Sequence, residues 1–414
     1  MHRAGLPVLL LLSLLAGLGA CDPARAPTAG PAASPAAPGR LADRPTPVTT
    51  PAASPATTRS SPAAPSSPAT SSPRTGPAAG EVLPPPDPAA IAQTVRFLHE
   101  SRPRYQQAIR RARGWLDTLR LDPQELRRHG IKGKKKLVEG VDAYLRLLLV
   151  APSTEQAGLR ARIQELAAVT RRPGYHDLAS LTEDELKQDS TSYLRLAYLL
   201  ERAGMKVPGY REEIRRIQPR LDAQMKRRGP HQRMAFHTYY TFFGLTEPFP
   251  LAAGFQGGVI ANRKDPATFQ TLLETYDLTH EVFVPYEFGE KLDADFFTPA
   301  DRAYLRRTLP VLTRRHLAQG DLDVVCELVS CLRYLELTDL PEYRQALAAI
   351  LDAQRPEGKW GDYERYRFRF GDLVDQGFYL HTTMVAIDAL TAAYDFPPRP
   401  GGAAVRGDAG RGAE

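Results

Sequence analysis

Apolar residues recur at intervals of three and four along most of the chain beyond position 89. In one such segment, Leu137, Val141, Tyr144 and Leu148 fall on a single face of a helix. The strict alternation that marks half-buried strands is missing. The pattern predicts an all-α chain of about eleven or twelve helices, among them 103–119, 134–149, 154–169, 191–203, 210–228, 231–244, 266–286, 298–319, 321–337, 342–353 and 378–394.

Polar and apolar helices alternate along this stretch. The segment 298–319 is rich in Arg, and the following segment 321–337 is mostly apolar. The same contrast separates 342–353 from 378–394. Helical hairpins with one solvated and one buried member stack into an open solenoid or close into a ring. Both arrangements remain open at this point.

The N-terminus carries an export signal. Arg3 precedes an apolar run over 6–18, which is too short to span a membrane, and Leu18-Gly19-Ala20-Cys21 follows at once. This junction resembles the lipobox of bacterial lipoproteins. The resemblance implies that the leader 1–20 is removed, that Cys21 becomes lipidated, and that the protein is anchored to a membrane of the cell envelope.

The segment 21–88 has the composition of a disordered linker. It holds 18 of the 37 Pro residues and consists mainly of Pro, Ala, Ser and Thr. Such a segment cannot bury enough apolar surface to offset its chain entropy. We therefore expect a tether that carries a helical domain over 89–396, outside the cytoplasm, and a disordered tail over 397–414.

Charge argues against one class of partner. The net charge of the chain is +7, but acidic and basic residues nearly balance within 89–396. A nucleic-acid footprint would need a concentrated basic face, so no nucleic-acid partner is expected.

A short motif favours the closed ring. Gln354, Gly358 and Trp360 stand in the pattern Gln-x-x-x-Gly-x-Trp. The region is similar to the repeat of terpene cyclases and protein prenyltransferases, whose hairpins form α/α toroids. The resemblance implies a toroid of about six hairpins, with an open solenoid as the alternative. The domain also resembles uncharacterised bacterial toroid-type proteins.

The cyclase and prenyltransferase chemistry does not follow from this resemblance. The Asp-x-Asp-Asp and Asp-Asp-x-x-Asp motifs are missing from the sequence. Asp323 and Cys326 are one residue too far apart to match the Asp-x-Cys zinc ligands of the prenyltransferases.

Three of the apolar helices carry polar residues that a plain core would not contain. The first two place three such residues at i, i+3 and i+4, on one helix face. In a toroid the inner helices face a central cavity, where these groups would meet. The residues are Asp277, His280 and Glu281; Asp323, Cys326 and Glu327; and, on the third helix, His381.

Two kinds of chemistry are open to this group. His280 and His381, with Cys326 or Asp323, would suit a zinc ion that keeps one position for water. Without a metal, His280 could work as an acid–base pair with Asp277 or Glu281. His231 and His237 are secondary candidates for the cavity wall.

Structural roles explain the same residues equally well. A helix-interior His is often a hydrogen-bonded core residue, and Asp near a helix start complements the helix dipole. Cys326 and Cys331 are five positions apart on one helix, about 8 Å and therefore beyond disulfide reach. They are either buried thiols or, for Cys326, a ligand.

Two functions follow as hypotheses. The first is an envelope lipoprotein whose cavity binds a small molecule, glycan or peptide, or which acts as a scaffold. The second is a cavity enzyme of hydrolytic type, in a metal-dependent or a metal-free form. Its catalytic groups would be His280, Asp277, Glu327 and His381. Zinc is the one cofactor that these residue types suggest.

Overall fold

The computed structural model describes residues 85–172, 175–269, 271–289, 291 and 295–395. The expected leader, the expected lipidation site at Cys21, most of the expected linker and the tail lie outside the described residues. The described part is all helical. Within it, no helix combines the length and the apolar character that a membrane span requires.

Fourteen α-helices make up the described chain. They are α2 (Pro88–Leu116), α3 (Pro123–Arg128), α4 (Gly133–Val150), α5 (Ser153–Ala168), α6 (Glu183–Arg202), α7 (Tyr210–Arg227), α8 (Pro230–Phe243), α9 (Leu251–Phe255), α10 (Leu272–Phe283), α11 (Pro299–Gln319), α12 (Leu322–Tyr334), α13 (Pro341–Asp352), α14 (Arg367–Phe370) and α15 (Leu380–Tyr394).

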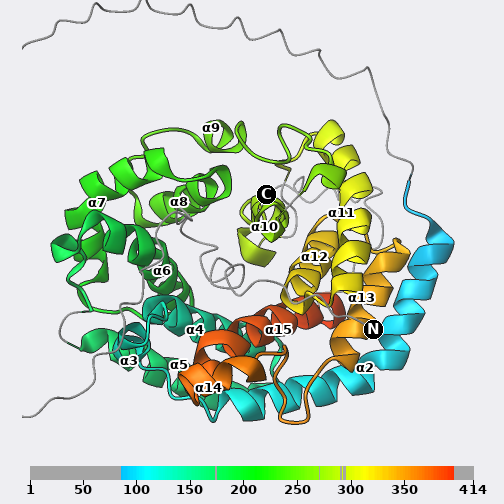
Figure 1. Cartoon of the computed structure of the whole chain (residues 1–414), viewed down its shortest axis with the longest axis horizontal. Coiled ribbons are helices and arrows are strands. Elements are labelled where there is room, and N and C mark those ends of the chain that lie inside the picture. The colour runs from blue at the N-terminus through cyan, green and yellow to red at the C-terminus, as the bar shows by residue number, and fades with distance from the viewer. Residues whose placement is uncertain (1–84, 173–174, 270, 290, 292–294, 396–414) are drawn as a thin grey trace, which may run out of the picture. The chain divides into compact units, whose positions relative to one another are not determined.

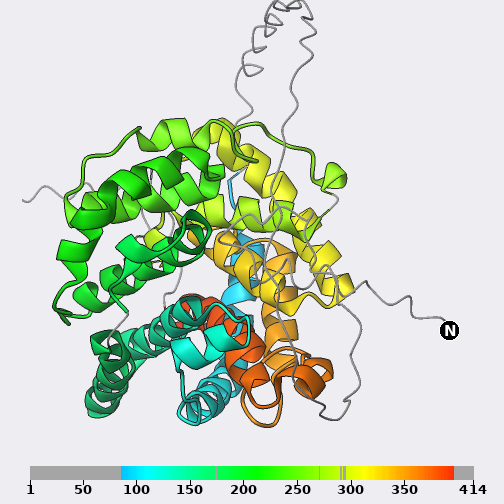
Figure 2. The ribbon, with the colours of Figure 1, turned by 60° about the vertical axis from the view of Figure 1, so that its left-hand side comes forward.

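Six of these helices form a closed circuit of contacts. α4 packs on α6, α6 on α8, α8 on α10, α10 on α12, α12 on α15, and α15 returns to α4. Figure 1 shows these six inside the domain, with α2, α7, α11 and α13 around them. The contact of red α15 with α4 is also visible in Figure 2. The circuit is compatible with the expected ring of hairpins, whereas an open solenoid would leave α15 and α4 apart.

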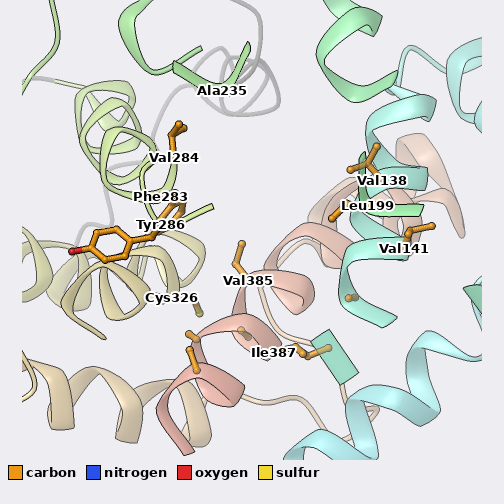
Figure 3. Close-up of a cluster of buried hydrophobic side chains, with 14 of the residues drawn as sticks. Val138, Val141, Leu199, Ala235, Phe283, Val284, Tyr286, Cys326, Val385 and Ile387 are labelled. Carbon is orange, nitrogen blue, oxygen red and sulfur yellow. The ribbon is translucent and has the colours of Figure 1, made fainter. Parts of the chain in front are cut away.

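The inner helices owe their position to apolar faces. Figure 3 shows part of the buried cluster, with Val138 and Val141 from α4, Phe283 from α10 and Val385 and Ile387 from α15. Each of these side chains is less than a tenth exposed. Burial of such side chains contributes about 1.5–3 kcal/mol each, which is the main force that closes the domain.

Three helices begin more than one turn away from the expected position. The helix expected at 103 begins at Pro88, capped by Asp87, and Pro103 lies inside it. α6 begins at Glu183 rather than at 191, behind a capping box of Thr182 and Glu185. The segment 266–286 is not one helix, because its first turn ends at Thr268 and α10 starts only at Leu272.

The Gln-x-x-x-Gly-x-Trp loop fastens the end of α13 to α2. The Gln354 amide donates to the carbonyls of Ala108 at 2.8 Å and of Gly358 at 2.9 Å. The buried Trp360 indole donates to the carbonyl of Ile350 at 2.7 Å. Gly358 has φ +105°, and a Cβ there would lie 2.2 Å from the Arg111 carbonyl oxygen. Only glycine fits this position without distortion.

Candidate functional site

A pocket lies among the inner helices. Its walls come from α4, α6, α10, α12 and α15, and Phe288 of the turn Glu287–Gly289 adds a further side chain. The empty space is about 900 Å³, counting the part open to solvent. His280, Glu327 and His381, which the sequence pattern groups together, all line this pocket.

Most charges in the pocket are matched by neighbouring charges of the opposite sign. On the α4 and α15 walls, Arg146 Nε lies 2.9 Å from Asp388 Oδ1. On the α4 and α6 walls, Arg195 bonds Asp142. Arg195 also lies over the Phe288 ring, 4.2 Å from its centre. These pairs satisfy one another, so the pocket presents them to a ligand as polar but locally neutral groups.

Aromatic and apolar side chains share the same walls. Tyr276, Phe283, Phe288 and Tyr334 line the pocket together with Met384. The Tyr334 hydroxyl donates to Asp388 at 3.2 Å, so this ring is held at the Arg146–Asp388 pair. The pocket therefore combines flat apolar surfaces with fixed hydrogen-bonding groups.

Glu327 is held in an environment that favours its neutral form. Its side chain is 3% exposed, and Thr279 Oγ1 lies 2.6 Å from Oε2. Burial raises the pKa of Glu327 to about 8; the Thr279 hydrogen bond opposes this, and the charge of Asp323 adds to it. At neutral pH this environment therefore favours the protonated carboxyl.

His280 is a neutral imidazole in the same wall. Nδ1 lies 2.8 Å from the carbonyl oxygen of Tyr276, to which it donates, and 3.7 Å from Glu327 Oε2. Burial, followed by repulsion from His231, holds the pKa of His280 well below its usual value. The hydrogen bond to Tyr276 places the proton on Nδ1 and leaves Nε2 as an acceptor.

Glu139 on α4 lies in the opposite environment to that of Glu327. Lys136 Nζ donates to Oε2 at 2.7 Å, while His381 Nδ1 and Lys135 Nζ lie 3.1 and 3.6 Å from Oε1. Burial alone would raise the pKa of Glu139, but the charges of Lys136, His381 and Lys135 outweigh burial and hold it well below its usual value. Glu139 is therefore ionised at neutral pH.

Asp277 and Glu281, which the sequence pattern pairs with His280, contact other groups instead. Asp277 lies 3.0 Å from Nδ1 of His231 rather than pairing with His280, and neither Asp277 nor His231 lines the pocket. Glu281 accepts hydrogen bonds from the backbone N–H groups of Val259 and Ile260, both at 2.9 Å. The acid–base pairs expected within 277–281 are therefore replaced by contacts that hold α8 and the 258–260 turn against α10.

The expected zinc ligands do not form a cluster. Asp323 accepts a hydrogen bond from the Tyr276 hydroxyl, and Cys326 is a fully buried free thiol outside the pocket wall. Burial raises the pKa of Cys326 well above its usual value, which disfavours the thiolate that a metal needs. Among the described residues, no three His, Cys, Asp or Glu side chains are grouped as a metal site.

The remaining sequence candidates have structural roles. Cys331 is buried and free, and its thiol faces the Thr279 carbonyl at 3.7 Å. His237 Nδ1 lies 2.6 Å from Glu247 and is not part of the pocket wall.

The sequence patterns missed the charged wall of α4. Lys135, Glu139, Asp142 and Arg146 follow one another at spacings of four, three and four, which places them on one helix face. A charged stripe of this kind is typical of a solvated face, but here it lines the pocket. The apolar face of α4 described in the sequence analysis lies opposite these charges and was the available signal, because it shows that other helices pack on that side.

The fold and the site together define a class of protein, an all-helical domain with a polar and aromatic central pocket. The chain belongs to a domain family of unknown function, DUF6895, which matches residues 104–389. The match runs from the middle of α2 to the middle of α15 and includes every residue of the pocket wall named above. No curated protein and no solved structure matches the chain.

Proposed function

We propose that the protein is an envelope lipoprotein whose helical domain binds an uncharged, polyhydroxylated ligand, a glycan, in the central pocket. One observation supports the ligand class most directly. The pocket's cations and anions neutralise one another beside four aromatic rings. A charged ligand would call for an excess of one sign, whereas sugar hydroxyls bond equally to carboxylates and guanidinium groups.

Aromatic rings favour the same ligand. The faces of pyranose rings carry C–H groups that pack on flat apolar surfaces such as Phe283 and Phe288. A purely apolar ligand would remove solvent from the Arg146–Asp388 and Arg195–Asp142 ion pairs and from the Glu139 carboxylate. That desolvation costs several kcal/mol for each buried charge, which disfavours a lipid in this site.

Calorimetric titration of the full chain tests this proposal. The probes are neutral α- and β-linked tetramers of glucose, mannose, galactose and N-acetylglucosamine, with a uronic-acid tetramer as the charged comparison. We expect at least one neutral tetramer to bind more tightly than the uronate. Met384→Trp, which fills the pocket from α15, should abolish that binding, and Leu149→Trp on the exposed side of α4 should leave it unchanged.

Either of two results rejects the ligand class. No neutral tetramer binds, or the Met384→Trp variant binds as the wild type does while both proteins remain folded by circular dichroism.

The location is proposed on the leader sequence. The apolar run and the Leu-Gly-Ala-Cys junction support lipidation at Cys21, and the Pro-rich segment supports a tether between anchor and domain. Cys21→Ser should release the protein from the membrane fraction and block incorporation of a labelled fatty acid. If the variant stays membrane-bound and the leader is cut at the same place, the anchor proposal is wrong.

A further inference from the structure

Two carboxyl groups of the pocket lie in environments that favour opposite protonation states. Glu327 on α12 is buried beside a hydroxyl and another acid, and Glu139 on α4 is buried beside two lysines and an imidazole. Both line the same pocket. A pair of acids that one site holds in opposite states is the arrangement used for general acid and general base catalysis.

The other two acids of the pocket bind arginine side chains. Asp388 holds Arg146 and accepts from Tyr334, and Asp142 holds Arg195. Glu327, by contrast, contacts its neighbours in the described chain through Oε2 only.

One carboxylate oxygen of Glu139, Oε1, accepts no hydrogen bond from the described chain. Oε2 is bound by Lys136, but Oε1 has no aligned hydrogen-bond donor, although His381 and Lys135 lie nearby. A buried carboxylate oxygen without a donor is costly to maintain, and a water molecule from the pocket would satisfy it. The same oxygen can then take a proton from that water.

We infer that the pocket hydrolyses a glycosidic bond of the glycan it binds, with Glu327 as the acid and Glu139 as the base. The inference rests on the proposed glycan binding. Glu327 gives its proton to the leaving glycosidic oxygen as the bond from that oxygen to the anomeric carbon breaks. Water attacks the anomeric carbon and gives its proton to Glu139. The proton then returns from Glu139 to Glu327 through solvent, and the net reaction consumes one water.

His280 and His381 act as positioning residues in this scheme. His381 Nδ1 is 3.1 Å from Glu139 Oε1 and helps to fix that carboxylate. His280 packs beside Glu327 and, being neutral, adds no positive charge that would favour loss of the Glu327 proton. In this scheme the chain's own carboxyl groups and one water molecule supply the groups that the hydrolysis needs.

The test uses the full chain and the neutral tetramer that binds best in the titration. The reducing-end-labelled tetramer is incubated with wild type, Glu327→Gln and Glu139→Gln, and products are resolved by chromatography. We expect wild type to cleave the tetramer and each variant to lose about 10²-fold or more of the rate. Both variants should still bind the tetramer, because Gln keeps the shape of the side chain.

A second substrate separates the two roles. The glycosyl fluoride of the same sugar has a leaving group that needs no protonation. Glu327→Gln should therefore hydrolyse the fluoride at nearly the wild-type rate, while Glu139→Gln should not. A variant impaired only by misfolding would lose both substrates and the binding.

The outcomes distinguish the two proposals. Binding without cleavage by wild type overturns the hydrolase inference and leaves glycan binding intact. Failure to bind any tetramer overturns both. Cleavage that survives either substitution shows that these two carboxyls are not the acid and the base.

Discussion

Replacing Glu327 by Gln should make stability less dependent on pH. In the unfolded chain the pKa of a glutamate is 4.5, and in the folded chain burial raises that of Glu327 to about 8. Between these values the folded state keeps a proton that the unfolded state has released. The folded state therefore loses stability relative to the unfolded state as pH rises through this window, and a Gln at the same place cannot contribute to that loss.

The magnitude follows from the two pKa values. Over the whole window from 4.5 to about 8, the difference corresponds to an upper bound of about 5 kcal/mol. Between about pH 5 and about pH 7, the wild type should lose about 2–3 kcal/mol relative to Glu327→Gln. Other buried acids, such as Glu281, contribute equally to both proteins, so their effects cancel in the comparison.

Urea unfolding at the two pH values measures this difference. The free energy of unfolding of Glu327→Gln minus that of wild type should rise between the lower and the higher pH. Glu357→Gln on the surface is the control and should change the unfolding free energy by no more than about 0.5 kcal/mol. A Glu327→Gln difference that is the same at both pH values would refute the assignment of a neutral buried carboxyl.

Other substitutions test the packing around the pocket. Arg146→Ala leaves Asp388 without its cation and should cost about 3 kcal/mol in urea unfolding, whereas Arg104→Ala, which breaks an exposed pair, should cost less than about 1 kcal/mol. Gly358→Ala forces a Cβ against a backbone carbonyl at positive φ and should lower the thermal midpoint by several degrees, about what a loss of 1–3 kcal/mol predicts. The thiol of Cys326 should resist iodoacetamide in the native protein and react after unfolding in urea, as followed by mass spectrometry.

The sequence predicted the helical class well because apolar periodicity reports which residues are packed. It was less able to place the start of α6, since Glu183 to Ser190 are polar or charged except Leu186. The capping box of Thr182 and Glu185 marks that start, and it is readable from the sequence. Asp265 caps the short turn Pro266–Thr268, which ends before α10 begins at Leu272, so the apolar pattern alone made this segment look like one helix.

The candidate site was predictable only in part, for a physical reason. Polar residues such as His280 and Glu327 are easy to recognise in the sequence because the other residues of their helices are mostly apolar. Glu139 lies on a helix whose second face is uniformly charged, and a charged face in a ring can point inward as well as outward. The sequence also does not show which side chain a polar residue will contact. Asp277 lies next to His231 because α8 packs on α10, and this packing is not visible in the sequence.

The most direct test of the central claim is a crystal structure of the full chain carrying Glu327→Gln, soaked with the neutral tetramer that binds best. We predict sugar density in the pocket, packed on Phe283 or Phe288, with a glycosidic oxygen at residue 327 and a water at Glu139 Oε1. An empty pocket with the tetramer bound on the outer helices, or a tetramer that contacts neither carboxyl, would contradict the account.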